Sequence, residues 1–221
     1  MGPQKDALSF FLVAAQNTEY QYAEEVLRNT TTNGTIYKDQ TGKVYEQKIS
    51  QLALANLDYD YRNRHHLSYN FMMVHDNVQS VGDYDGMDSG KFNDDYDNMG
   101  FTRRQQANDN WLLVNQLMTN WGLTKTLSFD AGASYNVVKG SEPDRRINNL
   151  RKAAEGYTLL EGNSQQRYFS ELNENDLNVK AGLTYRLADD QEEISNIRIG
   201  YNGRFVNDDF EATEYNMTVA H

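Results

Sequence analysis

Carboxylates gathered between residues 79 and 100 are the first group in the sequence that could do chemistry. The aspartates stand among Gly, Asn and Ser at Asp83, Asp85, Asp88, Asp94, Asp95 and Asp97. Carboxylate oxygens suit Ca²⁺, but an EF-hand loop needs Gly at its sixth position and Glu at its twelfth. Counted from Asp95, Gly100 fits, whereas Gln106 replaces the Glu. The spacing therefore favours a solvated loop, and no metal site is predicted.

Three histidines could act as metal ligands or as a catalytic base. His65 and His66 are adjacent, so in a strand they point to opposite faces and do not chelate one ion easily. A role beside a turn or on a polar surface is favoured for these two and for His75. The chain has no Cys and no G-x-S-x-G nucleophile elbow. No enzyme is predicted, although a triad built from distant residues is recognised only by its geometry.

The segment EPDRR at residues 142–146 places two cations beside a turn-forming proline. Arg145 and Arg146 could meet an anionic ligand. Salt bridges within the loop are the favoured alternative, because exposed loop charges commonly pair with one another. No catalytic residue, cofactor or ligand-binding residue is therefore predicted.

The elements that would position these residues are indicated by residues 127–138, LSFDAGASYNVV. Leu127, Phe129, Ala133 and Val137 alternate with polar or small residues, as in a strand with one apolar face. Strands of soluble proteins usually have about 5 to 6 residues. This run keeps its phase for about twice that length, which is enough to cross a bilayer at a tilt of about 45°.

The same alternation recurs along the chain and predicts about seven long strands. They are expected at about residues 7–15, 45–61, 67–73, 103–121, 126–138, 167–187 and 194–209. Tight turns are expected at residues 62–65, 122–125 and 188–193. Polar stretches predict long loops at residues 24–43, 79–100 and 139–165, the last with a helical or hairpin insert at 156–162. The fold class predicted is all-β, an antiparallel up-and-down meander.

Composition excludes several classes of protein. The 221 residues carry a formal net charge of −11, which argues against nucleic acid as a partner because phosphate binding needs clustered Lys and Arg. Aromatic residues at 12% are too abundant for a disordered chain. No window of about 18 apolar residues predicts a membrane helix. The apolar run at residues 7–15 follows no basic start, so no export signal is expected.

Connection lengths favour a membrane barrel. The expected connections alternate between long and short, as in bacterial outer-membrane barrels with short periplasmic turns and long outer loops. Aromatic residues beside the short turns fit an interfacial girdle, namely Tyr59, Tyr61, Trp121 and Tyr185. The polar face would then line the lumen, with candidates Asp130, Lys180, Arg186, Arg198 and Arg204. A soluble carbohydrate-binding β-sandwich and a small self-contained outer-membrane barrel, an adhesin or structural protein, remain as alternatives.

Three runs also resemble a known family: KTLSFDAGASYNVVKGSEPDRRINNL, RYFSELNENDLNVKAGLTYRL and IRIGYNGRFVNDDFEATEYN. They look like the barrel of TonB-dependent outer-membrane receptors, and most like the subgroup with a small carboxypeptidase-regulatory-like domain at its beginning. The resemblance implies a barrel of about 22 strands, a plug domain inside it, and energised uptake of iron chelates, vitamins or glycans.

The chain departs from that family pattern in three respects. No plug, no TonB box and no closing strand with a terminal aromatic are recognised. The expectation is therefore that residues 1–221 are a partial barrel domain of a parent receptor in the outer membrane. Its expected partners are outer-membrane lipid, the missing plug and barrel strands, TonB through the missing part, and a small-molecule ligand that the sequence does not identify.

Overall fold

The computed structural model describes residues 6–62, 64–92, 97–159, 162–187 and 195–219. Almost all of these residues lie in β-strands, and the described ranges include no helix. Accordingly, no helix long and apolar enough to cross a bilayer occurs in them.

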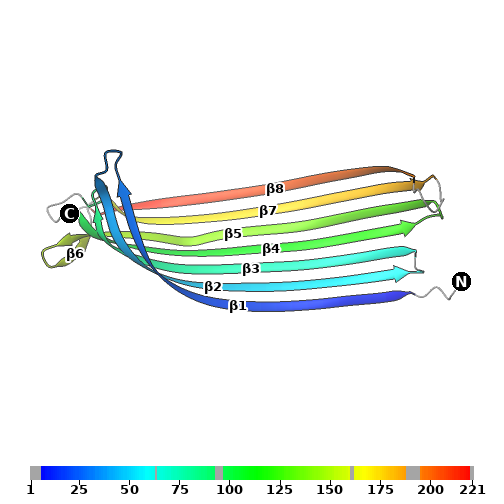
Figure 1. Ribbon diagram of the computed structural model, residues 1–221, viewed down its shortest axis with the longest axis horizontal. Coiled ribbons are helices and arrows are strands. Elements are labelled where there is room, and N and C mark those ends of the chain that lie inside the picture. The colour runs from blue at the N-terminus through cyan, green and yellow to red at the C-terminus, as the bar shows by residue number, and fades with distance from the viewer. Residues whose placement is uncertain (1–5, 63, 93–96, 160–161, 188–194, 220–221) are drawn as a thin grey trace.

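The strands form one antiparallel sheet in which neighbours in sequence are neighbours in space (Figure 1). The strands are β1 (Ala7–Thr30), β2 (Ile36–Tyr61), β3 (His65–Asp88), β4 (Met99–Gly122), β5 (Leu127–Ala153), β6 (Gly156–Leu159), β7 (Gly162–Arg186) and β8 (Asn196–Val219). Strand order is β1-β2-β3-β4-β5-β7-β8, and the short β6 pairs with β5. The predicted all-β meander is confirmed. Strands β1 and β8 lie at the two margins, so the sheet is open.

The polar stretches that were expected to be long loops are mostly strand, and their predicted boundaries are wrong. Residues 24–30 extend β1, residues 79–88 extend β3, and residues 139–153 extend β5. Cross-strand contacts supply the stability that the low β-propensity of Asp, Gly and Asn does not. The ring of Tyr84, for example, lies where a Cβ on Gly42 or Gly82 would stand, 2.5 Å and 2.8 Å from its nearest atoms. The expected insert after β5 is the hairpin formed with β6.

Connections fall alternately at the two ends of the sheet, as an antiparallel meander requires. We call the end at which β1 begins proximal and the opposite end distal. The proximal turn after β2 is closed by Arg64 N–H, which donates to Tyr61 O at 3.2 Å. The next proximal turn, after β4, is closed by Leu123 N–H donating to Leu127 O at 2.9 Å. The turn expected at residues 188–193 lies outside the described residues, between strands paired at Arg186 and Asn196.

An apolar belt crosses one face of the sheet near its proximal end. We call this face apolar and the opposite one polar. The belt takes every second side chain of residues 8–14, 53–61, 65–73, 113–121, 127–137, 177–185 and 197–205, with Asn115 and Thr119 as polar exceptions on β4. The register aligns these segments: Phe129 is paired with both Trp121 and Leu183, and Leu183 with Ile199. Leu127, Phe129, Ala133 and Val137, which were expected from the sequence to share an apolar face, all lie in the belt.

The distal limit of the belt lies within one row of the same level on all seven long strands. The next row on the same face contains one apolar side chain, Trp111, and six polar ones. From β1 to β8 the row reads Gln16, Gln51, His75, Trp111, Lys139, Asn173 and Asp209. The change from apolar to polar falls directly before this row on β1 to β5 and one row earlier on β7 and β8, where Asn175 and Asn207 already follow the belt.

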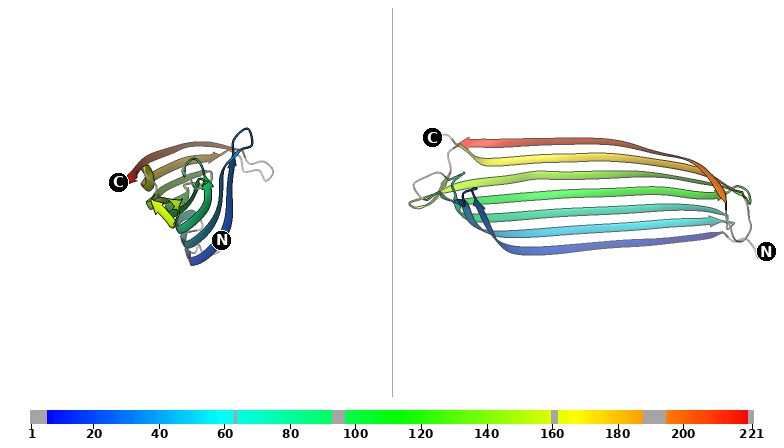
Figure 2. Two further views of the ribbon diagram at one scale, coloured as in Figure 1. Left: turned by 90° about the vertical axis from the view of Figure 1, so that its left-hand side faces the viewer. Right: turned by 45° about the horizontal axis from the view of Figure 1, so that its top comes forward.

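The sheet has almost no hydrophobic core. Among the described residues only Phe92 is a buried apolar side chain, whereas Phe10 and Ile199 in the belt are 77% and 74% exposed. The views in Figure 2 show a single curved layer with no second sheet packed on it. The soluble sandwich alternative requires such a second sheet, so the described residues contradict it. The belt is therefore an extensive apolar surface that no other part of the described chain covers.

Candidate functional site: the polar face

The five charged residues selected from the sequence lie together on the polar face. The register pairs Asp130 with Gly182, Lys180 with Gly132, and Arg198 with Thr184. It also pairs Arg204 with Asn178 and Arg186 with Asn196. Because strand side chains alternate, all five point away from the belt. Register and alternation thus place the five on one face of the sheet, and that this face lines a lumen stays a prediction.

Two of the four cations hold carboxylates at short distance. Arg198 Nη2 donates to Asp130 Oδ2 at 2.7 Å. Arg204 Nη2 lies 3.1 Å from Asp176 Oδ2. Sequence reasoning missed Asp176, because the ion pair depends on the register between β7 and β8. Lys180 lies against Gly132, where a Cβ would stand 2.8 Å from its Cε.

A small groove lies beside Lys180 on the polar face. Its volume is about 110 Å³. The polar side chains that line it include Gln116, Ser134, Asn178, Lys180 and Asn202. Amide groups offer both donors and acceptors, and Lys adds a single positive charge. This lining suits a polar or anionic ligand better than an apolar one.

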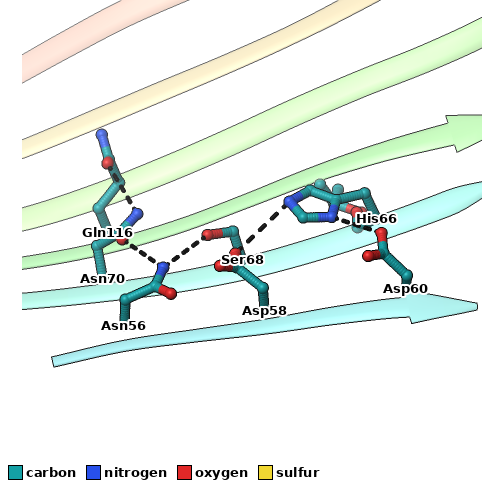
Figure 3. A network of polar contacts seen from close by, with 8 residues as sticks. Asn56, Asp58, Asp60, His66, Ser68, Asn70 and Gln116 are labelled. Carbon is teal, nitrogen blue, oxygen red and sulfur yellow. Dashed lines mark hydrogen bonds and ion pairs between the residues drawn. The ribbon is translucent and has the colours of Figure 1, made fainter. Parts of the chain in front are cut away.

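An amide ladder extends the polar face across β2, β3 and β4 (Figure 3). Asn56 Nδ2 donates to Asn70 Oδ1 at 2.9 Å and lies 3.4 Å from Ser68 Oγ. Asn70 Nδ2 in turn donates to Gln116 Oε1 at 3.4 Å. The three amides are far apart in the sequence, and only pairing of the strands joins them. The ladder keeps this part of the polar face hydrophilic at the level of the belt.

The adjacent histidines point to opposite faces, as expected. His66 lies on the polar face, with Nδ1 at 2.9 Å from Asp60 Oδ1 and Nε2 at 3.6 Å from Asp58 Oδ1 (Figure 3). His65 lies on the apolar face between Tyr61 and Trp121, with ring centroids 5.8 Å and 4.6 Å away. The two imidazoles therefore belong to different surfaces.

His75 has the geometry that comes nearest to a catalytic base. Its Nε2 lies 2.6 Å from Asp109 Oδ1, and its Nδ1 lies 2.9 Å from Gln51 Oε1. The ring stacks on Trp111 at 3.7 Å. Burial raises the pKa of Asp109, but hydrogen bonds from His75, Asn77 and Trp111 outweigh it and leave that pKa below its usual value. Both ring nitrogens face acceptors and neither faces a hydroxyl, so this is a structural cluster at the distal limit of the belt.

Three of the aspartates considered for calcium each contact a different side chain and do not converge on one point. Asp83 accepts two hydrogen bonds from Arg103, both at 2.7 Å. Asp88 is buried, with Lys38 Nζ 3.5 Å from its Oδ2, and Asp85 accepts a hydrogen bond from the Tyr157 hydroxyl. Asp94 and Asp95 lie outside the described residues. Within the described ranges no three His, Cys, Asp or Glu side chains group so as to hold a metal ion.

The EPDRR segment was expected in a loop but lies in strand β5. Its charged side chains form a cluster of ion pairs. A bulge in the pairing of β5 with β7 falls between Glu142 and Arg145. A bulge tolerates Pro143, which lacks the N–H that a strand interior requires. Asp144 accepts hydrogen bonds from Arg167 and Arg146, which hold the pKa of its carboxyl below its usual value. The expected preference for internal salt bridges agrees with this geometry.

A buried cluster at the distal end was not anticipated from the sequence. Phe92, fully buried, turns back onto the polar face, and a Cβ on Gly100 would lie 2.5 Å from its ring. Beneath it Thr102 Oγ1 donates to Asn149 Oδ1 at 2.8 Å. Burial lowers the pKa of Lys91, whose Nζ lies 3.5 Å from Asn149 Oδ1. The sequence offered only aromatic residues scattered among Gly, Asn and Asp as a signal.

Comparison with known proteins does not indicate a function, so the functional interpretation rests on the geometry of the sheet. No protein family, no characterised protein and no solved structure matches this chain. The observations that bear on function are therefore the aligned belt, the polar face opposite to it and the open edges of the sheet.

Proposed function

We propose that this chain is part of the wall of an outer-membrane β-barrel, with its apolar belt against lipid and its polar face toward a lumen. The aligned belt carries the proposal. A belt segment of nine residues is about 30 Å long, or about 23 Å tall at a tilt of about 40°. Transmembrane barrels have an outward apolar band about 25 Å tall. An apolar surface of that height, whose distal limit differs by no more than one row between the long strands, is suited to contact with lipid and not with water.

Aromatic side chains support this orientation. Tyr61, His65 and Trp121 mark the proximal limit of the belt, and Trp111 marks the distal limit. Trp111 Nε1 donates to Asp109 Oδ2 at 3.1 Å, away from the belt, whereas Trp121 Nε1 donates to Thr119 Oγ1 within it. Aromatic residues with a polar atom concentrate at membrane interfaces.

The type of barrel that we propose is a TonB-dependent receptor, which takes up a scarce small ligand and is not an enzyme. The support is the resemblance of three runs of the sequence, together with strands of 24 to 27 residues. At about 3.3 Å per residue these strands reach about 80 Å, far beyond the bilayer. Such a wall gives a deep lumen. Its amide ladder and ion pairs would contact a plug or a polar ligand, such as an iron chelate, a vitamin or a glycan.

Lipid contact is tested with tryptophan as a fluorescent probe. Both native tryptophans, Trp111 and Trp121, are replaced by Phe in the protein expressed from its intact gene. One tryptophan is then introduced, as Leu117→Trp in the middle of the belt or as Gln116→Trp on the polar face. Lipids brominated deep in their acyl chains should quench the first strongly and the second hardly at all. Equal quenching of the two would contradict the proposed orientation.

Transport is tested separately in cells. Uptake of radiolabelled ferric siderophores, cobalamin and oligosaccharides is compared in cells with and without the intact gene. One of these probes should accumulate only with the gene, and a proton uncoupler should abolish its accumulation. Gene-dependent accumulation that persists with the uncoupler would favour a passive channel over an energised receptor.

A further inference from the structure

The apolar face is hollowed into a groove beyond the distal limit of the belt. β1 and β2 bend out of the plane of the other strands toward their distal ends (Figure 1). A groove of about 640 Å³ lies across β1 to β5 in this region. The side chains that line it on the apolar face include Tyr20, Tyr22, Tyr45, Gln47, Gln79 and Gln105, with the ion pair of Asp144 and Arg146 at its β5 end. Tyr20 is paired with Gln47 and Tyr22 with Tyr45, so the aromatic and amide groups lie in adjacent rows.

The aromatic rings in the groove are exposed and held at their edges. Tyr20, Tyr22 and Tyr45 are 77%, 51% and 52% exposed. The Tyr22 hydroxyl donates to Glu24 Oε1 at 2.7 Å, and Gln47 Nε2 donates to the Tyr20 hydroxyl at 3.2 Å. These contacts hold the rings of Tyr20 and Tyr22 by their hydroxyls, and the ring of Tyr45 lies 5.1 Å from that of Tyr22, so much of the ring area stays open. These rings can therefore receive a ligand with little loss of side-chain freedom.

The combination of rings and amides suits a sugar. A pyranose ring has C–H groups that pack on an aromatic face, where the ring quadrupole attracts positive edges. Its hydroxyls both donate and accept hydrogen bonds, and so do the amides of Gln47, Gln79 and Gln105. A purely apolar ligand would leave these amides unpaired, which carries an energetic cost. A chain of sugars uses both kinds of surface at once.

The distance of the groove from the belt limits which molecules could supply that sugar. Tyr20 stands six residues beyond Ala14, the last belt residue of β1. Six residues span about 20 Å, or about 14 Å perpendicular to the membrane at a tilt of about 45°. The headgroup region of a bilayer is only about 5 to 8 Å thick on each side. A phospholipid headgroup does not reach the groove, whereas a headgroup of several sugars does.

We propose that this groove binds the oligosaccharide headgroup of a glycolipid in the leaflet that surrounds the distal part of the barrel. The inference rests on the proposed function, because it requires the belt to be in the membrane and the apolar face to be outside the barrel. Tyr20, Tyr22 and Tyr45 stack on the sugars, and the glutamine amides bind their hydroxyls. The ligand is a component of the membrane around the protein and is distinct from any transported molecule.

The test compares bound glycolipid in two Gram-negative hosts. One host makes the complete outer-leaflet glycolipid, and the other makes a form truncated to its lipid part. The protein, expressed from its intact gene, is extracted in mild detergent and examined by native mass spectrometry. We expect bound glycolipid only from the first host, and an approximately tenfold lower bound fraction in the double variant Tyr20→Ala/Tyr22→Ala.

Two further variants distinguish loss of binding in the groove from general effects of substituting a tyrosine. Tyr22→Phe keeps the ring and should retain the glycolipid. Tyr215→Ala should also retain it, because Tyr215 is 58% exposed in the same register row as Tyr22 but lies on β8, outside the groove. Loss of glycolipid in all variants alike would overturn the proposal.

Three other outcomes would also overturn it: equal binding of the truncated lipid, retention by the double variant, or tighter binding of the free oligosaccharide than of the glycolipid. Quenching of tryptophan by brominated lipids measures membrane insertion independently of glycolipid binding. If insertion holds and glycolipid is absent, only the groove proposal fails. If the belt is not inserted in the membrane, both the proposed function and the groove proposal are wrong.

Discussion

Arg198 on β8 bonds to Asp130 on β5 across the intervening strand β7, with 2.7 Å between Nη2 and Oδ2. The contact is possible because Gly182 lies between the two side chains. A Cβ on Gly182 would stand 2.8 Å from Asp130 Oδ1 and 3.1 Å from Arg198 Nε. The missing side chain therefore lets an ion pair tie three strands together on the polar face.

Replacing Gly182 with Ala should break this ion pair. Both partners are partly exposed, so we expect a loss of about 0.2 to 1 kcal/mol in the free energy of unfolding. Asp130→Asn should cost a similar amount, and the double variant no more than either single change. Urea unfolding of the protein in detergent micelles, followed by tryptophan fluorescence, measures the three values. Additive losses would mean that Gly182 matters for a reason other than the ion pair.

The faces of the sheet could be predicted from the sequence, because a period of two assigns each side chain once a strand is recognised. The assignment of Phe129 and Asp130 to opposite faces needed nothing more. The ends of the strands could not be predicted in this way. Residues 79–88 are rich in Asp and Gly, and only cross-strand partners, such as Arg103 for Asp83, keep them extended.

The contacts within the candidate site could not be predicted from the sequence, for a related reason. Asp130 and Arg198 are 68 positions apart, and Arg204 and Asp176 are joined through the register of β7 with β8. Register follows from the pairing of whole strands, and a slip of one residue would exchange the two faces. The sequence thus indicates which residues share a face, while their individual partners come from the folded sheet.

Charge should be tolerated on one face of the sheet and excluded from the other. Ala133 lies in the middle of the belt, and its neighbour Ser134 lines the small groove of the polar face. Ala133→Arg should cost about 2 to 4 kcal/mol, because a cation at mid-membrane loses its hydration. Ser134→Arg should change stability little. Unfolding in lipid vesicles measures both, and equal costs would contradict the assignment of the faces.

Acid should weaken the distal end through Asp144. Hydrogen bonds from Arg167 and Arg146 lower the pKa of this carboxyl in the folded protein. The unfolded chain therefore binds more protons in this range, and stability rises with pH. The contribution is complete above the unfolded value of about 4 and is lost as pH falls through the folded pKa.

The variant Asp144→Asn isolates this effect. Thermal unfolding between about pH 2 and pH 7 should show a smaller decrease toward acid in the variant than in the native chain. The difference between the two proteins should be largest near neutral pH and vanish at the acid end. A constant difference across the range would show that Asp144 does not contribute through its charge.

The 221-residue chain on its own should not be a soluble monomer. Its two marginal strands, β1 and β8, each have one side of the backbone that no other described strand pairs. In hydrocarbon each unsatisfied backbone group costs several kcal/mol, so an open sheet does not span a bilayer as a monomer. In water the same edges invite pairing with other chains, and the belt exposes Leu8, Phe10 and Leu12 at 65%, 77% and 73%.

Size-exclusion chromatography with light scattering checks this expectation. Without detergent the chain should elute as aggregates or higher oligomers, and detergent should reduce its apparent mass. Replacing Leu8, Phe10 and Leu12 by Ser on the edge strand β1 should lessen the association in water, because those substitutions remove apolar area beside an unpaired edge. The matched control places three Ser at Ala53, Ala55 and Leu57 on the interior strand β2, where the belt changes but no edge is affected. A sharp, detergent-free monomer with cooperative thermal unfolding would refute the proposal that this sheet is a barrel wall.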